Sequence, residues 1–161
     1  MKLKLISIAF FGLPLLSACS HEHGSIALDK IESSGDYQVK IFFHSQEKGF
    51  DVEANYFSCV SGDGNSERFY QERETGIWTF GKIESLGGES RSYRYVANMD
   101  VYYYNRKSNS FGNGDKNKVL TTLINSDFLT CRVVLRNYYR APGLTNGLKI
   151  NGKEFSTYFK K

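Results

Sequence analysis

Long hydrophobic runs and clusters of basic residues are both scarce in this chain of 161 residues. The longest apolar stretch, Leu5 to Leu16, is interrupted by Ser7, Gly12 and Pro14. At about a dozen residues it falls short of the roughly 20 that span a bilayer. No Lys/Arg cluster exceeds two residues, and the formal net charge is only +4. These features argue against a membrane-spanning helix in this stretch and against nucleic-acid binding.

Sequence motifs of catalysis are missing as well. There is no Cys-x-x-Cys pair of a redox enzyme and no Gly-x-Ser-x-Gly nucleophile motif. His44 ends a predicted strand without a partnered nucleophile, so a hydrolytic triad is not expected. Glu72 and Glu74 would suit glycoside hydrolysis only in a facing geometry, and a charged edge strand is the simpler interpretation. We therefore predict that the protein is not an enzyme.

Candidate metal ligands occur in three polar segments. The tract His21-Glu22-His23 brings imidazole and carboxylate together, but its short spacing defines no coordination geometry. Oxygen ligands alternate in two Gly-containing loops, at Asp63, Asn65 and Glu67 and at Asn113, Asp115 and Asn117. Neither loop has a full ligand set for Ca²⁺, and tight turns use the same residue types. We predict no metal site and no cofactor.

The first 19 residues carry the clearest motif in the chain. Lys2 and Lys4 precede the apolar stretch, and small residues lead into the tetrapeptide Leu16-Ser17-Ala18-Cys19. This order resembles the signal peptide and lipobox of bacterial lipoproteins. The resemblance implies that residues 1–18 are removed and that Cys19 becomes the first, lipid-modified residue, which several acyl chains hold on a membrane. The alternative is an ordinary signal peptide that leaves Cys19 as a free thiol.

The residue after Cys19 bears on the location. In enteric-type lipoproteins an Asp at this position favours the inner membrane, so Ser20 implies an outer-membrane lipoprotein that faces the periplasm. The mature chain would have 143 residues, which suits one domain with its own core. Its net charge would be about +2, because Lys2 and Lys4 are lost. We expect a polar tether over residues 19–30 and a β-rich domain over residues 31–161.

Two further cysteines, Cys59 and Cys131, remain in an oxidising compartment where disulfides persist. Only one pairing is possible between them, so we predict a structural disulfide that closes a long loop. The alternative is two buried free thiols.

Alternating hydrophobic patterns predict about seven strands. The first runs from Tyr37 to Phe43, a second from Phe50 to Val60, and a third from Gly76 to Ile83, with a turn at Gly87-Gly88. Later candidates are one bent strand or two over Ser92 to Tyr104, a strand over Phe128 to Leu135, and a hairpin around Asn151-Gly152. A short helix near residues 118–125 is consistent with the pattern, although its threonines would also allow a strand.

These strands and frequent turns predict an all-β fold, a single antiparallel β-sandwich in preference to a barrel. The spacing of Cys59, Trp78 and Cys131 loosely resembles an immunoglobulin-type Cys–Trp–Cys frame. Leu129 stands where that pattern has a corner tyrosine, so the resemblance implies only a two-sheet core joined by a disulfide.

The tyrosine-rich stretch is the best candidate for a binding surface. Tyrosine and arginine are the typical composition of interface hot spots. We predict that a partner contacts Tyr93, Arg94, Tyr95, Tyr102 and Tyr104, with Arg91 and Arg106 nearby. The competing interpretation is that one tyrosine face is core and the other merely covers the sheet.

Three functions are compatible with this sequence. The first is an outer-membrane-anchored periplasmic lipoprotein that binds a protein, as an immunity protein against a toxin or an inhibitor of an enzyme does. The second is a structural adaptor of an envelope or secretion complex. The third is a carbohydrate-binding or enzymatic lipoprotein, which the single Trp and the missing catalytic motifs make the weakest.

Overall fold

The structure of the protein is a computed structural model that describes residues 23–62, 64, 75–90, 92–108, 110–112, 116–136 and 143–159. Within these residues the chain forms one antiparallel sheet and two short helices. The strands are β1 (Ile26–Gly35), β2 (Gln38–Ser45), β3 (Tyr56–Ser61), β4 (Gly76–Glu89), β5 (Ser92–Asn105), β6 (Ser110–Gly112), β7 (Phe128–Leu135), β8 (Gly143–Leu144) and β9 (Leu148–Asn151). The helices are α2 (Lys116–Ile124) and α3 (Gly152–Ser156).

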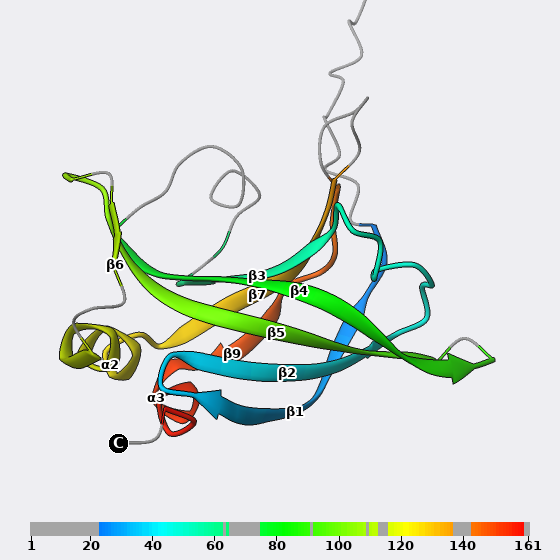
Figure 1. Ribbon diagram of the computed structural model, residues 1–161, viewed down its shortest axis with the longest axis horizontal. Helices are drawn as coiled ribbons and strands as arrows, with labels where there is room; N and C mark the ends of the chain where they lie inside the picture. Colours follow the sequence, from blue (N-terminus) through cyan, green and yellow to red (C-terminus); the bar gives the residue numbers. More distant parts are fainter. Residues whose placement is uncertain are drawn as a thin grey trace, which may run out of the picture.

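The sheet curls into a half-barrel (Figure 1). Its strand order is β1-β2-β5-β4-β3-β7-β8, with β6 paired to β5 and β9 paired to β7. The predicted all-β fold is confirmed, whereas the predicted two-sheet sandwich is not, because the described strands belong to one continuous sheet. The long strands β4 and β5, with 14 residues each, allow the inherent twist to wrap the sheet around its own core.

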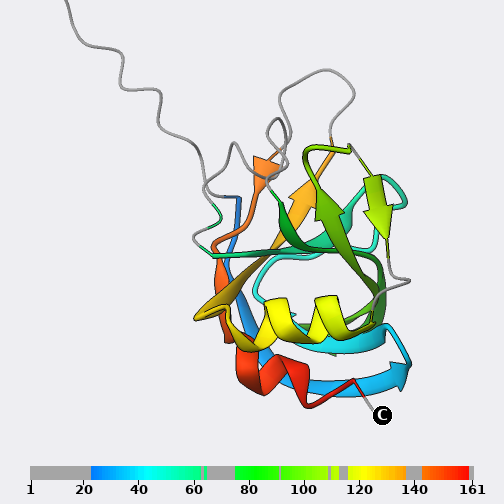
Figure 2. The ribbon, with the colours of Figure 1, turned by 90° about the vertical axis from the view of Figure 1, so that its left-hand side faces the viewer.

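The inner face of the half-barrel holds the main core. Alternation on β5 turns Tyr95, Ala97, Met99 and Val101 inward, where they pack with the inward residues of β2. The two helices cover the core: α2 buries Val119 and Leu123, and α3 buries Phe155 (Figure 2).

The two edges of the half-barrel meet at the start of β1. The Asn146 side chain accepts a hydrogen bond from the Ile26 N–H at 2.7 Å and donates one to the Ile26 carbonyl at 3.4 Å. The His23 N–H donates to the Leu144 carbonyl at 2.7 Å, and the Asn146 N–H donates to the Gly24 carbonyl at 3.2 Å. Residues Ile26 to Lys30, which we predicted as tether, therefore belong to a strand of the domain.

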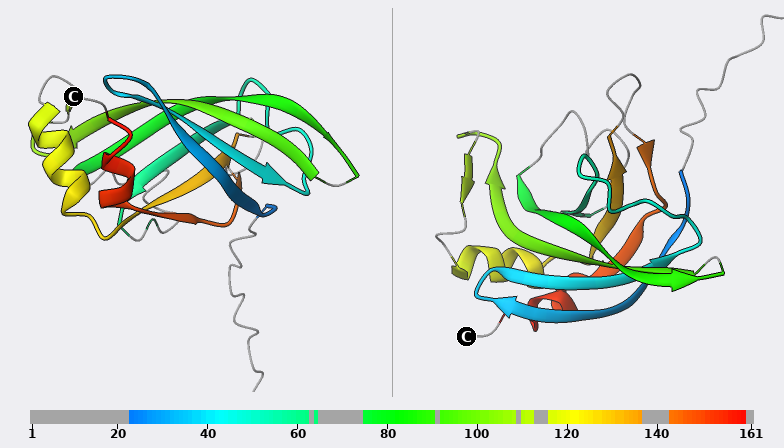
Figure 3. Two further views of the ribbon diagram at one scale, coloured as in Figure 1. Left: turned by 90° about the horizontal axis from the view of Figure 1, so that it is seen from below. Right: turned by 45° about the vertical axis from the view of Figure 1, so that its right-hand side comes forward.

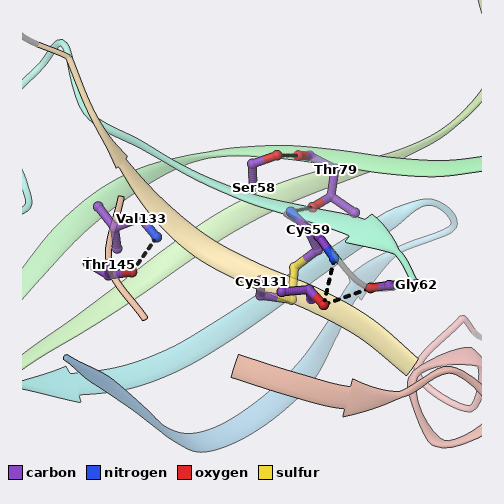
Figure 4. The surroundings of a disulfide bond; sticks show 9 residues. Ser58, Cys59, Gly62, Thr79, Cys131, Val133 and Thr145 are labelled. Carbon is purple, nitrogen blue, oxygen red and sulfur yellow. Dashed lines mark hydrogen bonds between the residues drawn. A yellow bond between two sulfur atoms is a disulfide. The ribbon is translucent and has the colours of Figure 1, made fainter. Parts of the chain in front are cut away.

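The predicted disulfide between Cys59 and Cys131 is confirmed (Figure 4). It joins directly opposed residues of the neighbouring strands β3 and β7, and both cysteines are fully buried. Thr79 on β4 supports the site, because its hydroxyl accepts a hydrogen bond from the Cys59 N–H at 2.8 Å. The bond lies within one sheet and does not join two sheets, so the immunoglobulin-type frame that the sequence suggested is wrong in this respect.

Two predictions of local structure are wrong, and each concerns a segment next to a glycine. We expected Phe50 to Asn55 to begin a strand, but these residues form a loop after Gly49, whose φ is 90°. The Phe50 ring turns inward onto Tyr95, with 5.4 Å between the ring centroids. We also expected a hairpin at Asn151-Gly152, but Asn151 caps α3 by accepting a hydrogen bond from the Glu154 N–H. The predicted helix near residue 118 is confirmed as α2.

Candidate functional site

The five residues predicted to bind a partner do not lie on one face. Successive residues of β5 point to opposite faces of the sheet, so Tyr93 and Tyr95 turn inward while Arg94, Tyr102 and Tyr104 turn outward. Even and odd positions of a strand never share a face unless a bulge intervenes. The predicted surface is therefore divided between the core, the β4–β5 hairpin and the outer face of the sheet.

Tyr95 is a core residue. Its side chain is 1% exposed, and its hydroxyl donates a hydrogen bond to the Glu47 carbonyl at 3.0 Å. The ring lies 5.4 Å from the Phe43 ring in a stacked arrangement. Burial raises the pKa of Tyr95, so the phenol stays neutral. The prediction that Tyr95 contacts a partner is wrong for this physical reason.

Tyr93 and Arg94 lie at the base of the β4–β5 hairpin. Tyr93 is half-buried against the inner core, and Arg94 is exposed on the outer face opposite His44 of β2. These two residues occupy neighbouring positions but face opposite directions, so they cannot act as one contact patch.

The outer face of the central strands carries a row of three half-buried aromatic rings, which we call the outer aromatic strip: Tyr56 on β3, Phe80 on β4 and Tyr102 on β5. The ring centroids of Tyr56 and Phe80 are 6.1 Å apart, and those of Phe80 and Tyr102 are 6.4 Å apart. The strip crosses three adjacent strands, so a rigid sheet fixes the relative positions of its rings.

A second hydrophobic cluster supports the strip. Trp78 and Tyr104 are only 4% and 5% exposed, and Trp78 lies 6.3 Å from both Phe80 and Tyr104. The remaining buried members of this cluster are Val60, Val134 and Leu144. The sheet therefore has hydrophobic packing on both faces, and Tyr104, another predicted contact residue, belongs to the buried cluster that lies beside the strip on the outer face.

Polar groups flank both ends of the strip. The guanidinium carbon of Arg136 lies 5.2 Å from the centre of the Tyr56 ring, a cation–π contact. The Arg136 N–H also donates to the Asn55 side-chain oxygen at 3.1 Å. At the other end, Gln38 donates a hydrogen bond to the Asp100 carboxylate at 2.8 Å.

The hydroxyl of Tyr102 is held as a neutral phenol. Burial raises its pKa, and the negative charge of the neighbouring Asp100 raises it further, as does a hydrogen bond between the two side chains. A neutral phenol both donates and accepts hydrogen bonds, so Tyr102 adds polar recognition to the strip.

Of the strip and its flanking groups, only Tyr102 was predicted from the sequence. Tyr56, Phe80 and Arg136 were not predicted, because they come from separate segments of the chain. One signal was available: the alternation in the third predicted strand places Trp78 and Phe80 on the same face. Placing Tyr56 and Tyr102 beside that face requires knowledge of the strand order β3-β4-β5, and the periodicity of the sequence does not predict strand order.

The catalytic and metal-binding candidates from the sequence do not form a site in the described residues. His44 has a partner, since its Nδ1 lies 2.5 Å from a carboxylate oxygen of Asp29. In the described ranges no group of three or more His, Cys, Asp or Glu residues could hold a metal ion. Several predicted positions lie outside the described residues: Cys19, His21, Glu22, Asp63, Asn65, Glu67, Glu72, Glu74, Arg91, Asn113 and Asp115.

Comparisons with known proteins do not identify a family or a function for the chain. No protein-family model, curated protein or solved structure matches the chain. No helix in the described part of the chain is long and apolar enough to cross a membrane.

Proposed function

We propose that the protein is a lipoprotein anchored in the outer membrane through Cys19, and that its periplasmic domain binds another protein through the outer aromatic strip. The partner is a toxin or an enzyme that the domain neutralises, as immunity and inhibitor proteins do. The observation that carries this proposal is the strip itself: three half-buried rings on a rigid sheet, with an arginine at one end.

The chemistry of the strip suits a protein partner. Tyr, Trp, Phe and Arg are enriched at the cores of protein interfaces, where large rings bury much area at little entropic cost. The rings of the strip are positioned before binding, because Trp78 and Tyr104 pack beside them on the same face of the sheet. Preorganisation of this kind lowers the cost of association.

The anchor is supported by the order of charge, apolar run, small residues and cysteine in residues 1–19. His23, four residues after Cys19 in the sequence, is hydrogen-bonded through its N–H to the Leu144 carbonyl of the domain. We expect Cys19→Ser to give an unlipidated precursor that leaves the detergent phase on Triton X-114 partition. Unchanged partition of that variant would contradict lipidation at Cys19.

Affinity capture tests the binding face. The chain from Ser20 to Lys161 is immobilised and exposed to envelope and secreted fractions, and retained proteins are identified by mass spectrometry. We expect one protein to be retained by the native sequence and lost with Phe80→Ser. A toxin or hydrolase would favour the immunity or inhibitor role, whereas a subunit of an envelope complex would favour an adaptor.

Phe42 offers a matched control for that experiment. It is also a half-buried phenylalanine, on β2, which β5 separates from β4, and the Lys30 ammonium lies 4.4 Å from its ring centre. Phe42→Ser should retain the partner. Equal loss of the partner with both variants would show that capture depends on general stability and not on the strip.

A further inference from the structure

The end of the half-barrel at which β1 starts also carries two projecting loops. Ile26 at the start of β1 pairs with Ser45, and Ser45 pairs with Tyr93 of β5. The loop over residues 46–55 follows Ser45, and the tip of the β4–β5 hairpin lies just beyond Tyr93. Figures 1 and 3 show these features together at one end of the molecule, with α2 at the opposite end.

The hairpin extends beyond its neighbour on one side. The pairing of β3 with β4 starts at Tyr56 and Lys82, so residues 84–89 of β4 pair only with β5. Every residue from Glu84 to Ser90 is exposed. Gly87 and Gly88 have positive φ angles of 85° and 148°, and a side chain at Gly88 would meet the Ser92 carbonyl. The hairpin therefore projects beyond the neighbouring strand β3, with a turn that favours glycine.

Exposed apolar side chains concentrate at this end. The described residues include four exposed large hydrophobic side chains, and three of them lie here: Val52 at 57%, Leu86 at 48% and Leu28 at 39% exposure. The fourth, Ile124 at 52%, ends α2 at the opposite end. Val52 lies in the loop after β2 and Leu86 lies in the projecting hairpin, so both are presented outward.

The covalent chain limits how far this end can lie from a lipid on Cys19. Cys19 and His23 are four residues apart, and a fully extended chain of that length spans about 14 Å. The His23 N–H is already bonded to the Leu144 carbonyl of the folded domain. A lipidated protein therefore keeps His23 and the start of β1 within about that distance of the lipid, at the end of the half-barrel that also carries Val52 and Leu86.

We infer that this end is a bilayer-contacting surface, in which Val52 and Leu86 insert into the interfacial region of the membrane that holds the lipid anchor. The inference rests on the anchor of the proposed function, not on the identity of its protein partner. Acidic residues surround the two apolar side chains: Asp51 and Glu53 beside Val52, and Glu84 and Glu89 in the hairpin, all exposed. Among the described residues of the 46–55 loop and the hairpin, the exposed cations are Lys48 and Arg94, fewer than these four carboxylates, so the surface suits zwitterionic headgroups that carry an ammonium group and disfavours anionic lipid.

Fluorescence quenching by brominated lipids tests this contact. The mature chain from Cys19 is coupled through that thiol to a maleimide lipid in vesicles of phosphatidylcholine and phosphatidylethanolamine with brominated acyl chains. Cys59 and Cys131 do not react, because they form the buried disulfide. Tryptophan is introduced as Val52→Trp, Leu86→Trp or Ile124→Trp, and the unsubstituted chain gives the background of the buried Trp78.

We expect Val52→Trp and Leu86→Trp to be quenched at least twofold more than Ile124→Trp, which matches them in exposure but lies at the far end. Adding phosphatidylglycerol should reduce that quenching. Equal quenching at all three positions, no quenching above background, or an increase with phosphatidylglycerol would overturn the inference. The anchor is supplied chemically here, so such a failure would leave natural acylation of Cys19 and binding of a protein partner as separate questions.

Discussion

Removal of the Cys59–Cys131 disulfide should destabilise the domain strongly. The bond closes a loop with a sequence separation of 72 residues, and it joins directly opposed residues in the ladder between β3 and β7. In the chain-entropy model a loop of this size corresponds to about 4 kcal/mol of stability, because the reduced unfolded chain gains conformational freedom. For a domain of this size that corresponds to a fall in Tm of roughly 12 °C.

The assay compares the chain from Ser20 to Lys161 with its Cys59→Ala/Cys131→Ala variant. Starting at Ser20 removes Cys19, so the oxidised protein has no free thiol and thiol titration verifies the bond. Urea denaturation gives the unfolding free energy of each form, and calorimetry gives Tm. Chemical reduction of the native sequence is the control, since it breaks the bond without the small cavity that the alanines leave.

Both treatments should lower stability, and the alanine variant should fall somewhat further than the reduced protein. A change below about 1 kcal/mol in both would refute the reasoning. It would mean that the unfolded chain keeps β3 and β7 together without the bond, or that the ladder does not depend on the crosslink.

Two other predictions follow from the hydrogen bonds and the buried phenols. Asn146→Ala should cost about 2 kcal/mol of unfolding free energy, because it removes both side-chain hydrogen bonds to Ile26 that close the half-barrel. Asn146→Asp keeps the acceptor and should cost less. Equal urea midpoints for the native sequence and both variants would contradict this role of Asn146. Stability should also fall as pH rises through about 10, because Tyr95 and Tyr102 have raised pKa values in the folded protein and ionise first in the unfolded chain. Urea titrations at pH 8 and pH 10.5 measure this loss, which Tyr95→Phe should reduce; an equal loss in that variant would assign the effect to other groups.

Strand positions were predictable where alternation is regular. β2, β4, β5 and β7 all fall on predicted segments, because each packs one side of its residues into a core. The Phe50 to Asn55 segment also alternates, yet it is a loop. Its pattern arises because Phe50 fills the core beside Tyr95 while the charged residues after it face solvent.

The arrangement of the sheet could not be predicted in the same way. Cys59 and Cys131 were correctly paired by count and compartment, but nothing in their spacing distinguishes a bond within a sheet from one between sheets. The Asn151-Gly152 pair is compatible with two local structures, a tight hairpin turn or the N-cap of a helix. Tertiary packing decides here, because a side chain at Gly152 would lie 2.4 Å from the Leu123 and Ser126 carbonyls.

The candidate site shows the same limit. Composition predicted an aromatic binding surface, but the residues proposed for it were mostly neighbours along one strand, β5. Neighbours in sequence point to opposite faces, whereas Tyr56, Phe80 and Tyr102 are brought together by pairing across three strands. Only the strand order reveals that Tyr95 belongs to the core and Phe80 to the strip.

Site-specific photo-cross-linking at Phe80 tests the central claim most directly. Benzoyl-phenylalanine replaces Phe80 in the full-length chain, made in its own cells with the native signal, and the same replacement at Phe42 is the control. The proposed function predicts one discrete adduct with a second protein from position 80 and none from position 42. No adduct at position 80, or the same adducts at both positions, would contradict the outer aromatic strip as the partner-binding face.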